Sequence, residues 1–226
     1  MSASSVARPY RGIAANDRVA SRRDALMRAG LHVFDTEGWS ALSARRVCEA
    51  AGLTRRYFYE SFQDLDALVA AIFVSISGEV TAAIRAMVKD ETLTVEERME
   101  RAVAAGLATL DPPVKGRFLV AAQRAGGSVS LHRAAVHNEL AILVRRALYA
   151  TQESRQRLIE PADAAIAARM ALGAVLALLD SWFEGEVELS SAEVSSRAAT
   201  AAIAIFEALG KRRRRGRMPI KGTEGR

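Results

Sequence analysis

Hydrophobic residues recur along most of this chain at the spacing of an α-helix. Between Asp17 and Glu37 the apolar positions follow the i, i+3, i+4, i+7, i+8 rule, which places them on one helical face, and Gly38 ends the run. These positions are Leu26, Ala29, Gly30, Val33 and Phe34. A β-strand would alternate with period two and favour β-branched residues, and no segment shows that pattern. The sequence therefore predicts an all-α protein.

Capping residues and helix breakers divide this pattern into nine predicted helices. They span about 17–37, 43–50, 54–61, 64–88, 94–110, 114–124, 128–153, 161–184 and 190–210. Ser, Thr or Asp opens most of them, because a side-chain oxygen can accept a hydrogen bond from a free backbone N–H of the first turn. Thr94 with Glu97, and Ser190 with Glu193, have the spacing of a capping box.

The composition is that of a globular protein in a reducing compartment. Half of the 226 residues are apolar and 26% are charged, which excludes a disordered or fibrous chain. A lone cysteine, Cys48, excludes an internal disulfide framework, and we expect it to be a small buried residue. The arginine-rich start of the chain is not a signal peptide, and the longest uncharged apolar stretch, Met170 to Leu179, is too short to cross a bilayer. We therefore expect a cytoplasmic protein that does not bind membranes.

The basic charge is concentrated at one end of the chain. The net charge of +6 divides into +2 for residues 1–66, −3 for residues 67–210 and +7 for residues 211–226. The last sixteen residues hold eight Lys and Arg with Gly and Pro among them, so we expect a disordered tail there. The net charge by itself is thus weak evidence for specific recognition of nucleic acid.

The most informative segment is 42–62, LSARRVCEAAGLTRRYFYESF. Two short capped helices flank the three-residue turn Ala51-Gly52-Leu53, which is the spacing of a helix-turn-helix. Val47, Leu53 and Phe58 are predicted to form the small core that fixes the angle between them. The outward positions carry arginines, hydroxyls and aromatic rings suited to phosphates and base edges. They are Ser43, Arg45, Arg46, Thr54, Arg55, Arg56, Tyr57 and Tyr59.

The segment from about Asp17 to Leu68 resembles the DNA-binding domain of the TetR family of bacterial transcription regulators. The first helix ends in F-x-x-x-G-W, then come the two short helices and D-L-D-A-L. The matching positions are Phe34, Gly38, Trp39, Ser43, Val47, Ala50, Gly52, Leu53, Phe58, Tyr59, Phe62 and Leu68. Nine helices in about 200 residues also agree with the architecture of that family.

The resemblance implies a role for each exposed residue of the motif. Ser43, with Arg45 and Arg46 beside it, matches the helix start that holds a backbone phosphate. Thr54 matches the hydroxyl that opens the recognition helix. The following Arg55, Arg56 and Tyr57 match positions that face base edges or nearby phosphates, and Tyr59 matches an aromatic whose hydroxyl reaches a phosphate. Two positions depart from the pattern: Leu65 replaces a frequent lysine, and Glu60 replaces a frequent histidine, so neither is expected to contact DNA.

The last two long helices are rich in small residues, which let helices approach closely. These residues are Ala164, Ala167, Ala168, Ala171, Gly173, Ala174 and Ala177, then Ala198, Ala199, Ala201, Ala202 and Ala204. Packing within one chain would explain this pattern as well as a dimer would, and the resemblance implies the dimer. A dimer would place two recognition helices on a pseudo-palindromic operator in double-stranded DNA.

The resemblance further implies an apolar pocket for an unknown small-molecule effector in the carboxy-terminal part. Candidate lining residues are bulky, flexible or polar in apolar surroundings, although each is equally well explained as ordinary core. They are Met87, Met99, Leu107, Phe118, Gln123, His137, Asn138, Met170 and Trp182.

No arrangement of residues in the sequence predicts catalysis, a metal site or a cofactor. The histidines His32, His132 and His137 lack carboxylate or cysteine partners at ligand spacing, and no nucleophile motif or phosphate-binding loop occurs. We therefore expect a DNA-binding regulator, not an enzyme. Two alternatives stay open: nonspecific DNA binding through the tail, and an all-α binding module or enzyme whose helix-turn-helix is only structural.

These interpretations divide the chain into four parts. We expect a flexible arm over 1–16, a three-helix DNA-binding domain over 17–63, a helical regulatory and dimerisation domain over 64–210, and the basic tail over 211–226.

Overall fold

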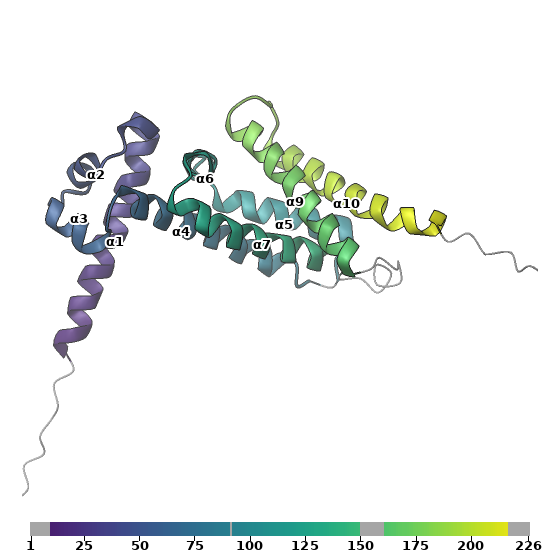
Figure 1. The fold of residues 1–226 in the computed structure, drawn as a ribbon, viewed down its shortest axis with the longest axis horizontal. Helices are drawn as coiled ribbons and strands as arrows, with labels where there is room; N and C mark the ends of the chain where they lie inside the picture. The colour runs from purple at the N-terminus through teal and green to yellow at the C-terminus, as the bar shows by residue number, and fades with distance from the viewer. Residues whose placement is uncertain (1–9, 91, 150–160, 217–226) are drawn as a thin grey trace, which may run out of the picture. The chain divides into compact units, whose positions relative to one another are not determined.

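A computed structural model describes residues 10–90, 92–149 and 161–216 (Figure 1). Nine α-helices and a short 3-10 helix make up this part of the chain, which contains no strand, so the all-α prediction is confirmed. The elements are α1 (Tyr10–Glu37), η1 (Trp39–Ala41), α2 (Ala44–Ala51), α3 (Arg55–Ser61), α4 (Leu65–Met87), α5 (Val95–Thr109), α6 (Val114–Ala125), α7 (Ser128–Tyr149), α9 (Pro161–Phe183) and α10 (Ser191–Gly216).

The helices begin where the capping residues predict. Thr94 Oγ1 accepts from the backbone N–H of Glu97, and the Glu97 carboxylate accepts from Thr94, so the predicted capping box is formed. Ser190 and Glu193 make the same reciprocal pair at the start of α10. In both pairs, hydrogen bonds from the capping residue hold the pKa of the glutamate below its usual value.

Two helix ends differ from the prediction. Helix α1 begins at Tyr10, so residues 10–16 are helical where the sequence suggested a flexible arm. Helix α10 continues to Gly216, so residues 211–216 are helical where a disordered tail was expected. In α10 the physical reason is that the added residues are mostly Lys and Arg, which are good helix formers. In α1 the added residues hold a single arginine, and the reason is that each residue added to an existing helix gains a backbone hydrogen bond. Residues 1–9 of the arm, 217–226 of the tail and 150–153 of the predicted seventh helix lie outside the described residues.

The chain divides into two compact units. Unit 1 comprises residues 1–75 and 121–132, and unit 2 comprises residues 76–120 and 133–226. The boundary falls inside α4, α6 and α7, so each of these helices belongs partly to one unit and partly to the other. Unit 1 therefore contains the expected DNA-binding domain together with the first part of α4 and the turn between α6 and α7.

Unit 1 is built around residues that α1, α2, α3 and α4 each contribute. Val33, Val47, Phe58 and Leu68 are at most 1% exposed, and the fully buried Leu26 of α1 joins them. Burial of such side chains contributes about 1.5–3 kcal/mol each. Because α2 and α3 are short, this shared core is what holds them against α1.

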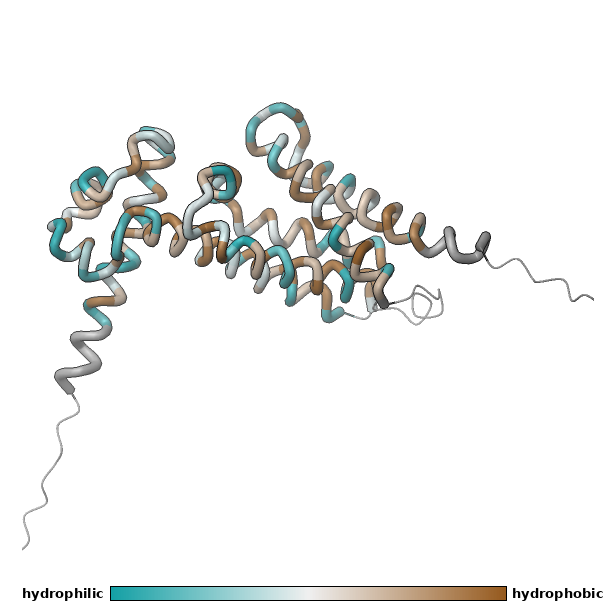
Figure 2. Tube along the Cα trace, viewed as in Figure 1, coloured by the Kyte–Doolittle hydropathy of each residue, from teal (hydrophilic) through white to brown (hydrophobic). Residues whose placement is uncertain are grey.

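Unit 2 holds a second core in which alanines bring helices close together. Ala164, Ala167 and Ala171 of α9 and Ala199 and Ala202 of α10 are almost fully buried in one cluster. Figure 2 shows hydrophobic residues along both helices. Much of the small-residue pattern is therefore explained by packing within one chain. Several of its members lie outside this packing: Gly173, Ala177 and Ala204 are exposed, and Ala174 and Ala201 are half-buried.

Two described helices, Leu65–Met87 and Ala162–Phe183, are long and apolar enough to cross a membrane by length and composition alone. About 44% of the first and 28% of the second is buried inside the protein over the most apolar stretch. Core helices of globular proteins commonly meet the same criterion.

A buried arginine ties the start of α5 to the end of α7. The Arg98 side chain is fully buried, and its guanidinium donates to the backbone carbonyls of Asp90, Leu93 and Ala147 at 2.9, 2.8 and 3.1 Å. Carbonyls that are free at the end of α7 and in the connection before α5 need a donor, and the Arg98 guanidinium supplies these bonds without being within ion-pair distance of a described carboxylate.

We predict that Arg98→Met lowers the free energy of unfolding by about 3 kcal/mol, because it leaves buried carbonyls without a donor. Urea denaturation followed by circular dichroism measures this change. Arg101→Met, an exposed site one turn along α5, is the control and should cost less than about 0.5 kcal/mol. Equal losses in the two variants would contradict a structural role for the Arg98 hydrogen bonds.

Candidate functional site

The segment 43–61 forms a helix-turn-helix in which the predicted side-chain cap is present at Ser43 and absent at Thr54. Ser43 is the N-cap of α2, and its Oγ accepts from the Arg46 backbone N–H at 3.2 Å. Gly52 ends α2 in the left-handed conformation, with φ of 64°, and Leu53 N donates to Cys48 O at 3.0 Å. An L-residue is disfavoured at this φ, so glycine permits the tight reversal between the two helices.

The core of the motif agrees only in part with the prediction. Val47 and Phe58 are fully buried, whereas Leu53 is half-buried. Phe58 contacts Phe62 with ring centroids 5.9 Å apart, and this contact continues the core toward α4. Cys48 is 5% exposed, and burial raises the pKa of its thiol, which agrees with its expected role as a small packing residue.

Three of the predicted contact residues present polar groups without a side-chain partner in the described part of the chain. Thr54 is the N-cap of α3, but its side chain makes no capping bond, so its hydroxyl is available to a ligand. Arg55 follows it, is exposed, and makes no ion pair with another described residue. Tyr59 is 59% exposed, with its ring edge-on to Phe58. These groups lie on the recognition helix α3 and at its start.

The other three arginines of the motif are paired with carboxylates. Arg46 binds Glu37 of α1 through Nε and Nη2, at 3.1 and 2.5 Å, and binds Glu49 through Nη1 at 2.5 Å. These partners raise the pKa of Arg46, and its guanidinium holds the pKa of Glu37 below the usual value. Arg46 therefore connects α2 to the end of α1, a positioning role that the sequence pattern does not reveal.

Arg45 and Arg56 make weaker pairs along their own helices. Arg45 lies 3.7 Å from Glu49, and Arg56 Nε lies 2.9 Å from Glu60 Oε1. Their side chains are 68% and 84% exposed, so water screens both pairs and an arriving phosphate can displace the carboxylate. Glu60, excluded from the contact set by its charge, orients Arg56.

The structure adds two arginines that the motif does not include. Arg22 of α1 lies over the ring of Tyr57, with its guanidinium carbon 4.5 Å from the ring centroid. Arg23 lies 4.2 Å from the centroid of Phe62 and donates to Ser61 O at 2.6 Å, at the end of α3. Both sites lie more than thirty residues before their partners in the sequence, and helical spacing along α1 gives no signal for them.

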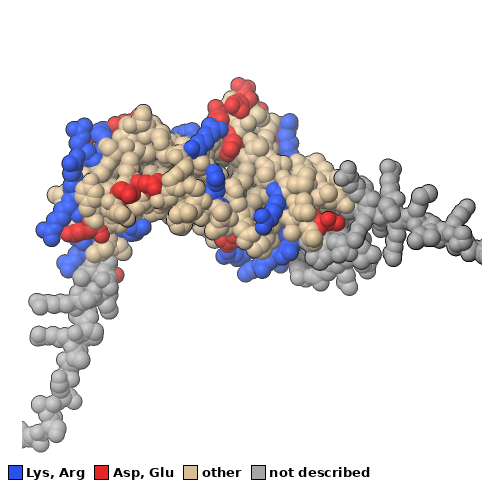
Figure 3. Space-filling model, in the orientation of Figure 1, with Lys and Arg blue, Asp and Glu red and all other residues tan. Residues whose placement is uncertain are grey.

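Arg22 differs from Arg23 in keeping its donors for an external partner. It makes no hydrogen bond or ion pair to another described residue, whereas Arg23 bonds the α3 carboxy-terminus. Figure 3 shows Lys and Arg side chains gathered over the part of unit 1 where α2 and α3 lie. Arg22 stacked on Tyr57 therefore places a further guanidinium, of a kind suited to phosphate, beside α3.

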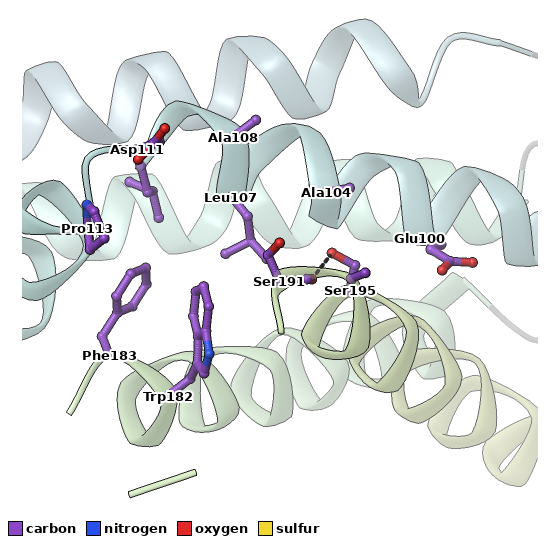
Figure 4. A pocket seen from close by; sticks show the side chains of 12 residues that line it. Glu100, Ala104, Leu107, Ala108, Asp111, Pro113, Trp182, Phe183, Ser191 and Ser195 are labelled. Atoms are coloured by element: carbon purple, nitrogen blue, oxygen red, sulfur yellow. Dashed lines mark hydrogen bonds between the residues drawn. The ribbon is translucent and has the colours of Figure 1, made fainter. Parts of the chain in front are cut away.

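Unit 2 contains a cavity of about 490 Å³ between α5 and the ends of α9 and α10 (Figure 4). Leu107 and Trp182, two of the predicted pocket residues, line it. The complete lining is Glu100, Ala104, Leu107, Ala108, Leu110, Asp111, Pro113, Trp182, Phe183, Ser191, Ala192 and Ser195. Most of these residues were missed, because a groove formed by alanines has no signature in the sequence.

The remaining predicted pocket residues lie elsewhere. Met99 and Phe118 are buried core residues, and Met87 packs against the core of unit 2. Met170 is 52% exposed on α9. The others are Gln123, in unit 1, and the neighbours His137 and Asn138 on α7.

His137 and Asn138 have described surroundings that do not include the cavity. Burial, and then the nearby Arg133, lower the pKa of His137, while Asp180 raises it. Asn138 Oδ1 lies 3.4 Å from an Arg169 nitrogen. Within the described ranges, no cluster of His, Cys, Asp and Glu has the arrangement of a metal site.

Comparison with known proteins supports the interpretation of unit 1. Residues 26–72 match the family model described as "Bacterial regulatory proteins, tetR family". This segment runs from α1 through the helix-turn-helix into α4. The sequence has no significant match among curated proteins.

Solved structures share the fold of this chain well beyond the segment that matches the family model. PfmR, a TetR-family regulator from Thermus thermophilus, is 16% identical, with a TM-score of 0.62 over 79% of this chain and 97% of its own. The fatty acid degradation regulator FadR from Bacillus halodurans is 16% identical, with a TM-score of 0.66 over 80% and 94%. A TetR-family regulator from Streptomyces coelicolor is 18% identical, with a TM-score of 0.66 over 90% and 92%. The predicted TetR-like fold is therefore confirmed, and a match to regulatory proteins agrees with the expectation that the chain is not an enzyme.

We predict that Arg22→Ala weakens binding to specific and random DNA alike and reduces the slope of log affinity against log salt by about 1, as expected for one lost phosphate contact. Fluorescence anisotropy with labelled duplexes at several salt concentrations measures both quantities. Arg28→Ala removes the same charge from an exposed site on another face of α1 and serves as the control. An unchanged slope for Arg22→Ala would show that this arginine serves only to hold Tyr57.

Proposed function

The chain carries the DNA-binding domain of the TetR family within a TetR-like fold, and from this premise we propose that it is a homodimeric, sequence-specific transcriptional repressor in the cytoplasm, released from its operator by a small molecule. The observation that carries the proposal is the recognition helix α3, whose exposed Thr54, Arg55 and Tyr59 have no competing side-chain partner among the described residues.

The recognition helix has the chemistry to read the major groove. Arg55 can donate two parallel hydrogen bonds to a guanine edge, and Thr54 and Tyr59 can bond phosphates on either side. Ser43 at the start of α2 and Arg22 beside Tyr57 add phosphate contacts that fix the orientation of α3. Arg45 and Arg56 add two more phosphate contacts when a DNA phosphate replaces the carboxylates of Glu49 and Glu60 as their partners.

Dimerisation is supported by an exposed apolar face on α9. Ile166 and Met170 are 51% and 52% exposed, and the exposed Gly173 and Ala177 continue the same face at spacings of three and four residues. An exposed apolar face of this kind on a helix surface is typical of a protein–protein interface. A twofold dimer would present two α3 helices about 34–36 Å apart, one turn of DNA.

Release by a ligand is supported by a link within unit 1 between α4 and α7. Asp66, in the first turn of α4, accepts from the Ser128 backbone N–H at 2.8 Å and from the Ser128 hydroxyl, at the amino-terminus of α7. Both helices continue into unit 2. A ligand that binds unit 2 better in one arrangement of these helices would shift the population toward that arrangement, and α4 would carry the change to the α3 it follows.

The first alternative, nonspecific binding through the basic tail, differs from this proposal in the source of affinity. A tail that contributes only phosphate attraction gives the same affinity for every sequence. The second alternative, a structural helix-turn-helix, requires α3 to have an internal partner, and the polar groups of Thr54, Arg55 and Tyr59 lack one in the described chain.

We expect selection from a random duplex library to yield a pseudo-palindrome bound at least about 10³-fold more tightly than random DNA at physiological salt. A variant with Arg212, Arg213, Arg214 and Arg215 changed to Gln, which preserves helix propensity, should keep this preference and lose affinity mainly for random DNA. Loss of the preference itself in that variant, or enrichment of no sequence by the wild-type protein, would contradict specific recognition through α3.

We further predict that Met170→Glu converts the dimer to a monomer and weakens operator binding by at least about tenfold, because a monomer presents only one recognition helix to the two half-sites. Light scattering after size exclusion measures the mass. Leu131→Glu places the same charge at another exposed hydrophobic site, 79% exposed in unit 1, and should leave the mass unchanged. A dimer that survives Met170→Glu would exclude this face of α9 as the interface.

A further inference from the structure

The cavity between α5 and the α9–α10 connection has the construction of a ligand site. Ala104, Ala108 and Ala192 are exposed along it, and their small side chains leave the space that gives a volume of about 490 Å³. This is the size of sites that hold drug-sized molecules. Leu107 and Leu110, which are 8% and 6% exposed, make its apolar floor.

Two aromatic rings form the opposite wall (Figure 4). The Trp182 and Phe183 rings lie with centroids 4.8 Å apart, and Trp182 Nε1 donates to Leu189 O at 2.8 Å. Phe183 packs directly over Gly116 of α6, where any side chain would overlap the ring. The rings are thus held in place from two sides, and the wall does not have to be organised when a ligand arrives.

The charge of the lining selects among apolar ligands. Two of the twelve lining residues, Glu100 and Asp111, are acidic, and none is basic. Neither carboxylate forms an ion pair or hydrogen bond with another described residue. They stand near the two ends of the cavity in Figure 4; Glu100 lies on α5, and Asp111 follows the carboxy-terminus of that helix.

Acidic residues next to the cavity make the electrostatic potential there more negative. The connection from α9 to α10 carries the exposed Glu186 and Glu188, and Figure 3 shows acidic side chains gathered on it. Lys115 of α6, two residues after the lining residue Pro113, is occupied by Glu79 at 2.7 Å and by Thr109 O. An anionic ligand would meet repulsion here, whereas a cation would be attracted by the carboxylate at its end of the cavity and by the faces of the two rings.

We propose that this cavity binds an apolar aromatic cation, and that such a cation is the effector of the proposed regulator. The site and its ligand class rest on the cavity, its rings and its unpaired carboxylates. The effector role also rests on the function proposed above.

Tetraphenylphosphonium and tetraphenylborate test this proposal, because the two ions share nearly the same shape and apolar surface and differ in the sign of their charge. Isothermal titration in sodium buffer at low salt should show the phosphonium binding at least about tenfold more tightly than the borate. Equal affinities, or tighter binding of the borate, would overturn the proposal.

Variants locate the binding in the cavity. Glu100→Gln with Asp111→Asn should weaken phosphonium binding by about fivefold, and Glu96→Gln, an exposed acidic site on the same helix outside the cavity, should not change it. Trp182→Leu should weaken binding by about tenfold, whereas Trp182→Phe, which also loses the bond to Leu189 but keeps a ring, should retain most of it. Phosphonium binding unaffected by all of these changes would place the cation elsewhere and overturn the site.

Operator binding, measured on the same preparations without ligand, separates this proposal from the proposed function. A protein that binds its selected operator but not the phosphonium overturns the cavity proposal alone. A protein that binds the phosphonium through these residues but selects no operator overturns the regulatory function and leaves the binding site standing. Phosphonium that binds in the cavity without lowering operator affinity overturns the effector role.

Discussion

Helices as short as α2 and α3, of eight and seven residues, do not hold a fixed geometry by themselves, and the whole interface depends on how they are anchored. The anchor is α1. It contributes Leu26 and Val33 to the core that buries Val47 and Phe58, and it adds three polar or cation–ring contacts at the rim. Arg46 is tied to Glu37, Arg23 to Ser61 O, and Arg22 to the Tyr57 ring. The apolar contacts supply most of the energy, and the rim contacts set the angle at which α3 is presented.

This arrangement reduces the number of arginines in the motif that are available for phosphate contacts. Four arginines in a short segment suggest four phosphate contacts, but the structure gives them different states. Arg55 alone is without an ion pair among the described residues, whereas Arg46 is divided between two carboxylates and one of them lies on another helix. A guanidinium held in this way contributes less net charge at the surface and more rigidity. Charge counting therefore overestimates the free positive charge of α2, whereas Arg22 of α1 presents a guanidinium beside Tyr57 from a position outside the motif.

The structural features that depend on the spacing of neighbouring residues could be predicted from the sequence. Caps at Ser43, Thr94 and Ser190, the reversal at Gly52 and the all-α class follow from contacts within a few residues, and the structure bears them out. The pairs Arg22–Tyr57 and Arg46–Glu37 and the alanine-lined cavity depend on which faces meet after folding. The hydrophobic periodicity of a single helix carries no information about which helix its faces will contact. The same reason explains why Leu107 and Trp182 were found among nine pocket candidates, while Met99 and Phe118 proved to be core residues: bulk and apolarity describe a core position as well as they describe a pocket wall.

The two uses of small residues in α9 and α10 show how one composition can serve separate purposes. On the inward faces, Ala167 and Ala202 are fully buried and let the two helices of one chain approach closely. On the outward face of α9, Gly173 and Ala177 continue the face of the exposed Ile166 and Met170 and leave a surface that a second helix could approach equally closely. The start of α10 adds a third use, since Ala192 with Ala104 and Ala108 of α5 leaves the cavity open. Small side chains thus make close packing where two helices face each other and make empty space where a helix end faces aromatic rings, so their effect is decided by the partner surface rather than by the residues themselves.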